Sequence, residues 1–356
     1  MNYPIVIGDI SFESLQLFLA ENFEGYQKII LCDENTEEAS LMRIDFEGVP
    51  DLIGAETMTV PPGEESKSFA IVEQLVEAML ESGLTRKTLI LNLGGGMVGD
   101  LGGFLASIYK RGIPFIQIPT SLLAMVDASV GSKTAINVGG IKNQAGVFSD
   151  PQGVFIYPGF LETLPERELK SGYAEMLKHA LISDAEYWKT LTSRDWGQNE
   201  DWEALIRQSV DIKSAIVESD PLEKGPRKAL NFGHTFGHAL ETLSHAAEKP
   251  LLHGEAIAFG IMLEAGLSQM HCGLSAQEYG EICEFISEHF GYLNPPKFAF
   301  ESWVQIMRAD KKNSSDKINF TLLTGIGAHE INREFEEAEL QTVIDEFNAI
   351  DFSSEN

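Results

Sequence analysis

The clearest indication of how this chain folds is a glycine-rich stretch, Leu93-Gly94-Gly95-Gly96-Met97-Val98-Gly99-Asp100. Its glycines fit the spacing G-x-G-x-x-G, in which the backbone turns sharply and approaches a pyrophosphate at a helix N-terminus. The apolar run Leu89–Leu93 predicts a buried strand before the turn, and Val98–Lys110 predicts a helix after it. With the next strand at Pro114–Ile118, this pattern predicts half of a nucleotide-binding domain.

Similar units extend toward the N-terminus. Ile5-Val6-Ile7 and Ile29-Ile30-Leu31-Cys32 are apolar runs that end at turn residues and predict strands. Gly83 follows a predicted helix as a C′ glycine, and the apolar stripe of that helix consists of Phe69, Val72, Leu75, Val76, Met79 and Leu80. We therefore expect an α/β, Rossmann-like domain over residues 1–158.

The pattern changes after Pro158, where helical periodicity becomes dominant. It continues from Leu164 to Phe347, and Ile318–Leu323 predicts one short strand. We therefore expect a second, mainly α-helical domain over residues 159–356.

Composition limits the cellular setting. The 356 residues are 44% hydrophobic, which suits two globular domains. No apolar run approaches the roughly 18 residues of a membrane span, and the first ten residues lack a signal-peptide pattern. The three cysteines, Cys32, Cys272 and Cys283, form no C-x-x-C pair, which argues against a disulfide framework. These features favour the cytoplasm.

The formal net charge of −28 argues against nucleic acid or an anionic membrane as a partner. Several of the basic residues nevertheless lie beside glycines or histidines in the middle of the chain, which predicts a local anion site. An acidic ribose ligand is expected about 20 residues after such a glycine turn, but Arg111 and its neighbours lie there instead. A glycine turn without a ligand is the competing interpretation. Asp33, after an earlier strand, is an alternative ribose ligand or a simple turn residue.

A second group of candidates lies in Asn231-Phe232-Gly233-His234-Thr235-Phe236-Gly237-His238. His234 and His238 are four residues apart and share one helix face. Glu175 and His253 flank this segment, and histidines with a carboxylate are ordinary Zn²⁺ ligands that leave a position open for substrate. Spacing alone selects His234 and His238 and leaves open whether His253 replaces one of them. Unrelated polar residues are the alternative interpretation.

Other polar candidates are cations and one loop. Lys178 lies three residues after Glu175, so both project from one helix face. The segment Asp127–Asn137 mixes charged and amide residues with small ones, and Lys142-Asn143 follows nearby. Such a mixture makes a poor core and a poor helix and predicts a polar binding loop. Solvated surface is the alternative for the remaining cations, Lys213, Arg227, Lys311 and Lys312.

Together these segments resemble the 3-dehydroquinate synthase family and its sugar phosphate cyclase relatives. The matching blocks are collinear: Pro62–Lys67, Gly94–Asp100, Tyr109–Gly112, Pro119–Asn137, Lys142-Asn143, Leu164-Pro165, Gly172–Lys178, Leu230–His238, His253–Glu255 and Asp310–Lys312. The resemblance implies a nucleotide-binding α/β domain followed by a mainly helical metal-binding domain. Ser132 stands where the family commonly has glycine, and Ser121 where threonine is frequent.

The resemblance also implies roles for single residues. Glu175, His234 and His253 would bind a divalent metal, Zn²⁺ or Co²⁺, and His238 would instead lie beside the substrate phosphate. NAD would be bound by Asp33, Glu64, Lys67, Gly95, Gly96, Val98, Gly99, Asp100, Thr120, Ser121, Lys142 and Thr163. Substrate would be bound by Asp127, Lys133, Asn143, Lys178, Lys213, Arg227, Asn231, His238 and one of Lys311 or Lys312. Arg111 is a candidate to reach the phosphate site of the neighbouring subunit in a homodimer.

The implied activity is a phosphate-eliminating cyclisation in the shikimate pathway. The seven-carbon keto acid phosphate DAHP would become 3-dehydroquinate and phosphate through transient oxidation by NAD, phosphate elimination, reduction, ring opening and intramolecular aldol closure. One alternative is another sugar phosphate cyclase, although those relatives change residues around Lys213, Asn231 and His238. A second alternative is a metal-dependent polyol dehydrogenase of the glycerol dehydrogenase type, and a third is a nucleotide-binding regulator without activity.

Overall fold

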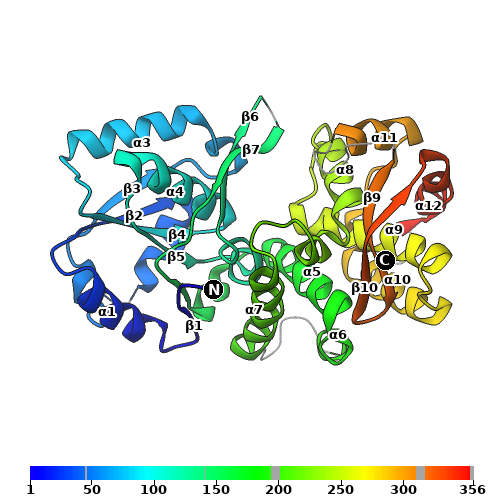
Figure 1. Cartoon of the computed structure of the whole chain (residues 1–356), viewed down its shortest axis with the longest axis horizontal. Coiled ribbons are helices and arrows are strands. Elements are labelled where there is room, and N and C mark those ends of the chain that lie inside the picture. Colours follow the sequence, from blue (N-terminus) through cyan, green and yellow to red (C-terminus); the bar gives the residue numbers. More distant parts are fainter. Residues whose placement is uncertain (45, 140, 194–200, 310–316, 353–356) are drawn as a thin grey trace. The chain divides into compact units, whose positions relative to one another are not determined.

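The computed structural model describes residues 1–44, 46–139, 141–193, 201–309 and 317–352 (Figure 1). The chain divides into two compact units. The first comprises Met1–Leu169 and Asp201–Val210, and the second comprises Lys170–Glu200 and Asp211–Asn356. Buried apolar side chains fill the interior of both units.

The first unit is built on a parallel sheet with the strand order β1-β8-β5-β4-β2-β3. All residues of the central β4 and of β8 are buried, which explains why these strands are continuous apolar runs. From β2 the chain continues to β3 at one edge, and from β4 it continues to β5 on the other side. The boundary between β2 and β4 is therefore the topological switch point, where α/β sheets bind ligands at their carboxyl ends. The strands are β1 Ile5–Ile7, β2 Gln27–Asp33, β3 Glu56–Val60, β4 Thr88–Gly94, β5 Phe115–Pro119 and β8 Val154–Ile156.

Helix α3 buries a narrower stripe than the sequence predicts. Val72, Leu75 and Met79 lie in the core that α3 shares with α4 and the sheet. The prediction was wrong for Phe69 and Leu80, which lie at the edges of the stripe and are 55% and 54% exposed. The C′ glycine is confirmed, since Gly83 has a φ of +68°. The helices of this unit are α1 Ser11–Asn22, α2 Glu34–Ala39, α3 Phe69–Glu81 and α4 Gly96–Ile108.

The segment predicted to be a polar loop mostly forms regular structure. Ala124–Ala128 is a π-helical turn, η5, and an antiparallel hairpin of β6 Lys133–Val138 and β7 Ile141–Phe148 follows it. Thr134 and Ile136 are buried and Lys133 is exposed, which is the alternation of a half-buried strand. The loop prediction was wrong here because small and polar residues conceal this alternation in the sequence.

Helices dominate the second unit, as the sequence predicts. Helix α9 runs through its core, and every residue from Gly254 to Ser268 is buried. Among the described helices, none combines the length and the apolar character of a membrane span. Two helices, α5 Glu166–Ser183 and α7 Trp202–Ser219, begin in the first unit and end in the second. The other helices of the second unit are α6 Ala185–Thr192, α8 His234–Ser244, α9 His253–His271, α10 Ala276–Phe290, α11 Phe300–Ala309 and α12 Glu337–Ala349.

The second unit also contains an antiparallel hairpin. Strand β9 Ile318–Gly325 confirms the short strand that the sequence predicts, whereas its partner β10 Ala328–Phe335 was missed. Of the residues in β10 only Phe335 is buried, so this strand has almost no apolar signal.

Short connecting turns lie in both units. They are η1 Leu41–Arg43, η2 Pro50–Leu52, η3 Glu64–Ser66, η4 Tyr109–Arg111, η6 Pro158–Thr163, η7 Pro226–Asn231 and η8 Gly291–Leu293.

Candidate functional site

The glycine turn of the first unit joins β4 to α4. Gly95 is the N-cap of α4, and no side chain caps this helix start. The first backbone N–H groups of a helix have no partner inside the helix, and the positive end of the helix dipole lies there. The turn therefore offers a site for an anion such as a pyrophosphate.

Close packing, and not an unusual backbone angle, requires glycine in this turn. None of its glycines has a left-handed φ: Gly94, Gly95, Gly96 and Gly99. A Cβ atom on Gly94 would lie 2.6 Å from Cβ of Val98. A Cβ atom on Gly95 would meet only the Ser121 side chain, with Oγ 3.4 Å away, so a ligand can approach the backbone at this position.

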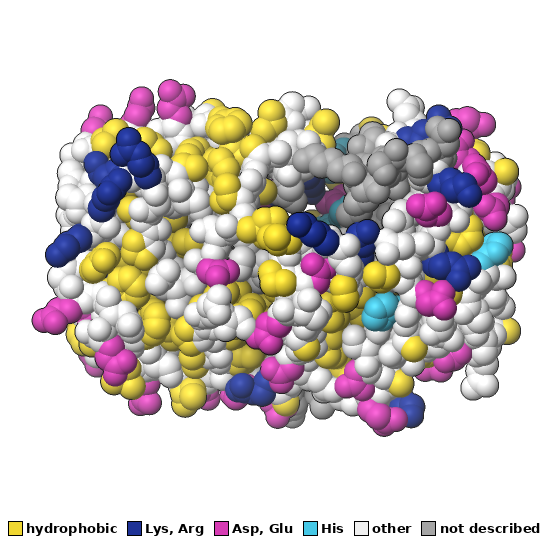
Figure 2. Space-filling view, in the orientation of Figure 1, with side chains coloured by type: hydrophobic (Ala, Val, Ile, Leu, Met, Phe, Trp, Pro, Cys, Tyr) yellow, Lys and Arg dark blue, Asp and Glu magenta, His cyan; other side chains and the backbone are white. Residues whose placement is uncertain are grey.

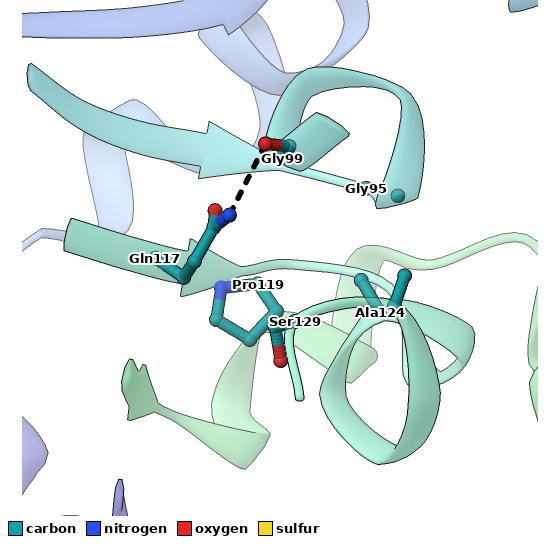
Figure 3. A pocket seen from close by; sticks show the side chains of 9 residues that line it. Gly95, Gly99, Gln117, Pro119, Ala124 and Ser129 are labelled. Carbon is teal, nitrogen blue, oxygen red and sulfur yellow. Dashed lines mark hydrogen bonds between the residues drawn. The ribbon is translucent and has the colours of Figure 1, made fainter. Parts of the chain in front are cut away.

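A small pocket lies between the glycine turn and η5 (Figure 3). Gln117 lines it and donates a hydrogen bond from Nε2 to the carbonyl oxygen of Gly99, at 3.1 Å. Ser129, which directly follows η5, also lines it, and its buried Oγ has no hydrogen-bond partner within the described residues. The sequence did not single out Gln117, because a glutamine in a buried strand has no distinctive spacing, and it included Ser129 only as a member of the predicted binding loop Asp127–Asn137.

Asp33 ends β2 beside the glycine turn. The register pairs Leu31 with Asn92, so Asp33 lies level with Gly94 at the carboxyl end of the sheet. Its Oδ1 accepts the N–H of Thr36 at 2.9 Å and caps α2. A carboxylate has further acceptor sites, so this capping role is compatible with binding a ribose hydroxyl.

A buried lysine connects several predicted residues. Lys67 is 3% exposed and donates to Oδ2 of Asp100 and to Oδ1 of Asn143, both at 2.8 Å. Its ammonium also lies 3.8 Å from Glu64 Oε1, and Glu64 Oε2 accepts from Asn137 Nδ2 at 2.9 Å. Burial raises the pKa of Asp100, and the charge of Lys67 opposes that shift. The structure thus joins residues that the resemblance divides between NAD and substrate.

The other predicted residues of the first unit lie on the segments that follow the strands. Thr120 donates its N–H to the Gly94 carbonyl at 3.0 Å, and Ser121 Oγ accepts from the Ala124 N–H at 3.3 Å. Thr163 closes η6 and donates to the Phe160 carbonyl at 3.2 Å. Val98 is buried in the first turn of α4, Asp127 lies in η5, Lys133 begins β6 and Lys142 lies in β7.

Three of the positions discussed above adopt left-handed backbone conformations although they are not glycine. Arg111 has a φ of +72° and follows Lys110 at +47°, so two consecutive residues of this turn are strained. Asn143 has a φ of +53° and Ser132 has a φ of +63°. The value at Ser132 gives a physical reason for the glycine that the family commonly has there.

A carboxylate and two histidines converge in the second unit. Oε1 of Glu175, on α5, lies 3.6 Å from Nε2 of His234 and 3.6 Å from Nε2 of His253. His234 is the first residue of α8 and His253 is the first residue of α9. Ligand atoms about 2.1 Å from a tetrahedral zinc ion lie about 3.4 Å apart, so both distances from Glu175 Oε1 fit such an ion.

His238 lies close to the same group. The ligand nitrogens of His234, His238 and His253 lie within 4.8 Å of one another. The ring centroid of His238 is 5.1 Å from that of His234 and 5.7 Å from that of His253. Oε1 of Glu175 lies 3.6 Å from Nε2 of His234 and of His253, so these two histidines are candidates to share a metal ion with the carboxylate.

The Nδ1 atom of both His234 and His253 faces a hydrogen-bond acceptor. Nδ1 of His234 lies 3.1 Å from the Phe232 carbonyl oxygen, and Nδ1 of His253 lies 3.1 Å from Glu241 Oε2. Both partners are oxygen atoms that accept a hydrogen bond from Nδ1–H. In a neutral ring with its hydrogen on Nδ1, Nε2 keeps a lone pair that can bind a metal. Burial and the charge of Lys178 lower the pKa of His234 well below 6.5. Burial acts in the same direction on His253, but Glu241 and Glu175 outweigh it and raise its pKa to about 10.

Glycines allow α5, α8 and α9 to approach closely. A Cβ atom on Gly260 of α9 would overlap the carbonyl oxygen of Gly233, and one on Gly254 would overlap the carbonyl oxygen of Ser171. The Gly254 N–H also donates to Ser171 Oγ at 3.0 Å. Sequence reasoning did not use these glycines, although glycine is unfavourable inside a helix and its presence there signals close packing.

Buried cations accompany the histidines. In the part of the chain that the structure describes, the buried lysines and arginines are Lys67, Lys178, Lys213 and Arg227, and each is a predicted site residue. Acidic side chains instead spread over the visible surface, in line with the net charge of −28 (Figure 2). Buried cations are costly without an anionic partner. In the second unit, the Lys178 ammonium contacts Glu175 Oε2.

Asn231 is hydrogen-bonded to Glu223, a residue that the sequence did not single out. Its Nδ2 donates to Glu223 Oε1 at 2.9 Å, and Glu223 has a left-handed φ of +58°. Arg227 donates from Nη1 to the Pro221 carbonyl at 2.7 Å, which fixes it in the same turn region. The candidates Lys311 and Lys312 lie outside the described residues.

Comparisons with known proteins cover most of the chain. Residues 57–171 match the family model described as 3-dehydroquinate synthase N-terminal, and residues 172–313 match its C-terminal counterpart. A protein of Parabacteroides distasonis described as 3-dehydroquinate synthase is 42% identical over 332 residues, which are 92% of this chain and 93% of that protein.

Solved structures show the same fold. A 2-deoxy-scyllo-inosose synthase complexed with carbaglucose-6-phosphate, NAD⁺ and Co²⁺ superposes with a TM-score of 0.81 at 23% identity, covering 96% of both chains. A 2-epi-5-epi-valiolone synthase of Streptomyces hygroscopicus with NAD⁺ and Zn²⁺ bound gives a TM-score of 0.79 at 26% identity, covering 98% of this chain and 97% of that one.

Proposed function

The chain belongs to the 3-dehydroquinate synthase family, and we propose that it catalyses the family reaction with one NAD and one divalent metal ion. DAHP is converted to 3-dehydroquinate and phosphate, by a lyase of the shikimate pathway. The substrate is oxidised transiently, loses phosphate, is reduced again, opens its ring and closes a carbocycle by an intramolecular aldol step. NAD is therefore not consumed.

The spacing of Glu175 Oε1 carries this proposal, because it lies 3.6 Å from Nε2 of both His234 and His253. One carboxylate and two imidazoles leave a position open for substrate on Zn²⁺, and the same nitrogen and oxygen ligands accept Co²⁺. We assign these three residues as metal ligands and place His238 beside the substrate phosphate.

The first unit supplies the cofactor site in this proposal. The uncapped start of α4, where Gly95 leaves room, would hold the pyrophosphate of NAD, and Asp33 would hold a ribose hydroxyl. Lys67 keeps Asp100, Glu64 and Asn143 in one network, so the NAD ligands and one substrate ligand are fixed together. The remaining assigned cofactor ligands are Gly96, Val98, Gly99, Thr120, Ser121, Lys142 and Thr163.

When bound, NAD would supply reversible hydride transfer, and the metal held by Glu175, His234 and His253 would supply Lewis-acid chemistry toward an alcohol. The chain's own residues orient and neutralise a substrate that carries both a carboxylate and a phosphate. Charge-assisted hydrogen bonds suit this task, and a cation that is already buried pays its desolvation before the substrate arrives. The residues assigned to it are Asp127, Lys133, Asn143, Lys178, Lys213, Arg227, Asn231 and His238, with Lys311 or Lys312.

Phosphate elimination does not require a strong side-chain base. The oxidised substrate has an acidified C–H beside its new ketone, and the substrate phosphate itself can accept that proton. The residues that hold the phosphate, His238 among them, then act by keeping it at the C–H.

One assay tests this function. The protein is incubated with Zn²⁺ or Co²⁺, DAHP and NAD at a small fraction of the DAHP concentration, and phosphate and 3-dehydroquinate are measured. Both products should exceed the NAD supplied, without a rise in near-ultraviolet absorbance from NADH. A polyol dehydrogenase would accumulate NADH from a polyol, and another cyclase would leave DAHP unchanged. Either outcome would overturn the proposal.

We also propose a homodimer that works in the cytoplasm. The β6–β7 hairpin exposes the apolar side chains of Val138, Ile141, Val147 and Phe148, which are 38–60% exposed and suit burial against a second copy. In that dimer Arg111, held in its strained turn, would reach the partner's phosphate site. The free cysteines of the described residues suit a reducing compartment. Light scattering of wild type and of Phe148→Lys would test the dimer, which the lysine should weaken.

A further inference from the structure

Both histidines assigned to the metal begin a helix, which is an unusual place for a cation. His234 is the first residue of α8 and His253 is the first residue of α9. The N-terminal end of a helix carries a partial positive charge, which attracts anions and opposes a divalent cation. A metal at this position therefore requires nearby negative charge that compensates both helix starts.

Glu264 meets this requirement at α8. Its Oε2 accepts the N–H of Gly233 at 2.6 Å, and its Oε1 accepts those of Thr235 at 2.9 Å and Phe236 at 3.3 Å. The N-cap Gly233 has no side chain with which to cap its own helix. The cap therefore comes from α9, as a carboxylate that is fully buried.

The arrangement is reciprocal between the two helices. Glu264 lies three helical turns after His253 on α9 and holds the start of α8, which carries His234. Glu241 lies on α8 and accepts from Nδ1 of His253 at 3.1 Å. Each helix thus carries one histidine and one carboxylate that fixes the histidine of the other helix.

We propose that Glu264 is a positioning residue for the metal site, which neutralises the N-terminus of α8 and fixes the turn that aims His234. The proposal rests on the proposed function, because it takes Glu175, His234 and His253 as the ligands. Glu264 does not touch the metal and acts through the backbone of Gly233, Thr235 and Phe236.

The substitution Glu264→Gln separates charge from size. The glutamine amide accepts hydrogen bonds through its oxygen only, and its NH₂ group would face a backbone N–H donor. The negative charge that compensates the start of α8 is lost, together with part of the cap. Loss of such an outer partner typically weakens metal binding about 10–100-fold. We expect this loss for Zn²⁺ and Co²⁺ in the metal-free protein, measured by competition with a colorimetric chelator.

Glu278→Gln is the matched control. Glu278 also accepts backbone N–H groups, from Ser275 at 3.1 Å and from Ile326 at 3.0 Å. Neither of these residues lies on α8 or α9, the helices that carry His234 and His253. It should lower thermal stability and leave metal affinity and the visible absorption of bound Co²⁺ unchanged. Glu264→Gln should instead weaken the affinity and alter the Co²⁺ spectrum, which a purely structural role would not do.

The outcomes separate the two levels of inference. Wild-type protein that binds no metal would refute the proposed metal site itself. Wild type that binds one ion per chain, with a Glu264→Gln variant of equal affinity and equal Co²⁺ spectrum, would refute only the role of Glu264. If Glu264→Gln does not fold, Glu264→Asp is compared in the same way. It keeps the charge but shortens the reach, so an affinity equal to that of Glu278→Gln would also refute the role.

Discussion

The packing of α8 against α9 makes a sharp prediction for Gly260→Ala. The added Cβ atom would overlap the carbonyl oxygen of Gly233 and lie 2.7 Å from the Gly237 nitrogen. Ordinary contacts of a Cβ atom begin near 3.4 Å, and both neighbours are backbone atoms that no rotamer change can move away. The helices must therefore separate, and such overpacking costs about 1–3 kcal/mol.

The intrinsic helix propensity acts in the opposite direction. Replacing a mid-helix glycine by alanine stabilises by about 0.5–1 kcal/mol, so we take the upper end of the packing cost and expect a net loss of about 2 kcal/mol. At roughly 2–4 °C per kcal/mol for a unit of this size, the melting temperature should fall by about 4–8 °C. Metal affinity should fall as well, because helix separation moves His234 away from His253.

Gly280→Ala is the matched control, because Gly280 also lies inside a helix, α10, and a Cβ atom there meets nothing within 4 Å. It should raise the melting temperature by about 1–4 °C through propensity alone. Differential scanning fluorimetry with and without Zn²⁺ would compare both variants with wild type. A Gly260→Ala protein that melts at or above the wild-type temperature would refute the packing argument.

Four further predictions concern the site and the stability of the fold. His253→Ala should abolish metal-dependent turnover, and a variant that remains active with a chelator in metal-free buffer would contradict the ligand assignment. Lys178→Met should change NAD affinity, measured by calorimetry, by no more than about twofold. Turnover should fall about 100-fold or more, as when a group that stabilises the transition state is removed. Loss of NAD affinity would show that Lys178 was assigned to the wrong site. Gly95→Ala should weaken NAD binding at unchanged melting temperature, because the Cβ atom fits the fold but occupies the approach to the backbone; unchanged NAD affinity would refute that reading. Hydrogen bonds from Lys28 and Gln16 lower the pKa of Asp51. The free energy of unfolding of wild type should therefore exceed that of Asp51→Asn by its full margin above pH 3.8, and this margin should disappear as the pH falls through the lowered pKa. A margin that instead grows in acid would show that the sign of this argument is wrong.

The sequence predicts the first unit well where local patterns coincide. Around Gly94–Asp100 an apolar run, a glycine spacing and a helical pattern agree, and the structure places β4, the turn and α4 there. The failures have a common physical cause. The strands β6, β7 and β10 face solvent with many small or polar side chains, so they lack the apolar alternation by which strands are found.

The site shows a different limit of sequence reasoning. Helical spacing could pair His234 with His238, because that relation is local, but the approach of Glu175 and His253 depends on the packing of three helices. The sequence offered Glu175 and His253 as flanking candidates, but only the family resemblance selected them together with His234. Glu241 and Glu264 had no signal at all, since a glutamate inside a helix is ordinary until the structure shows it buried against a neighbouring helix.

The order of the three proposed metal ligands along the chain has a consequence for folding. Helices α8 and α9 are consecutive, so a short loop brings His234 and His253 together early, as local contacts usually form first. Glu175 comes from α5, with α6 and α7 between, so its arrival requires a longer loop to close. With these three residues as ligands, a partly folded chain would present two of them instead of three and would retain an ion poorly until the helical unit is complete. Metal retention would then report on whether a newly made chain has finished folding.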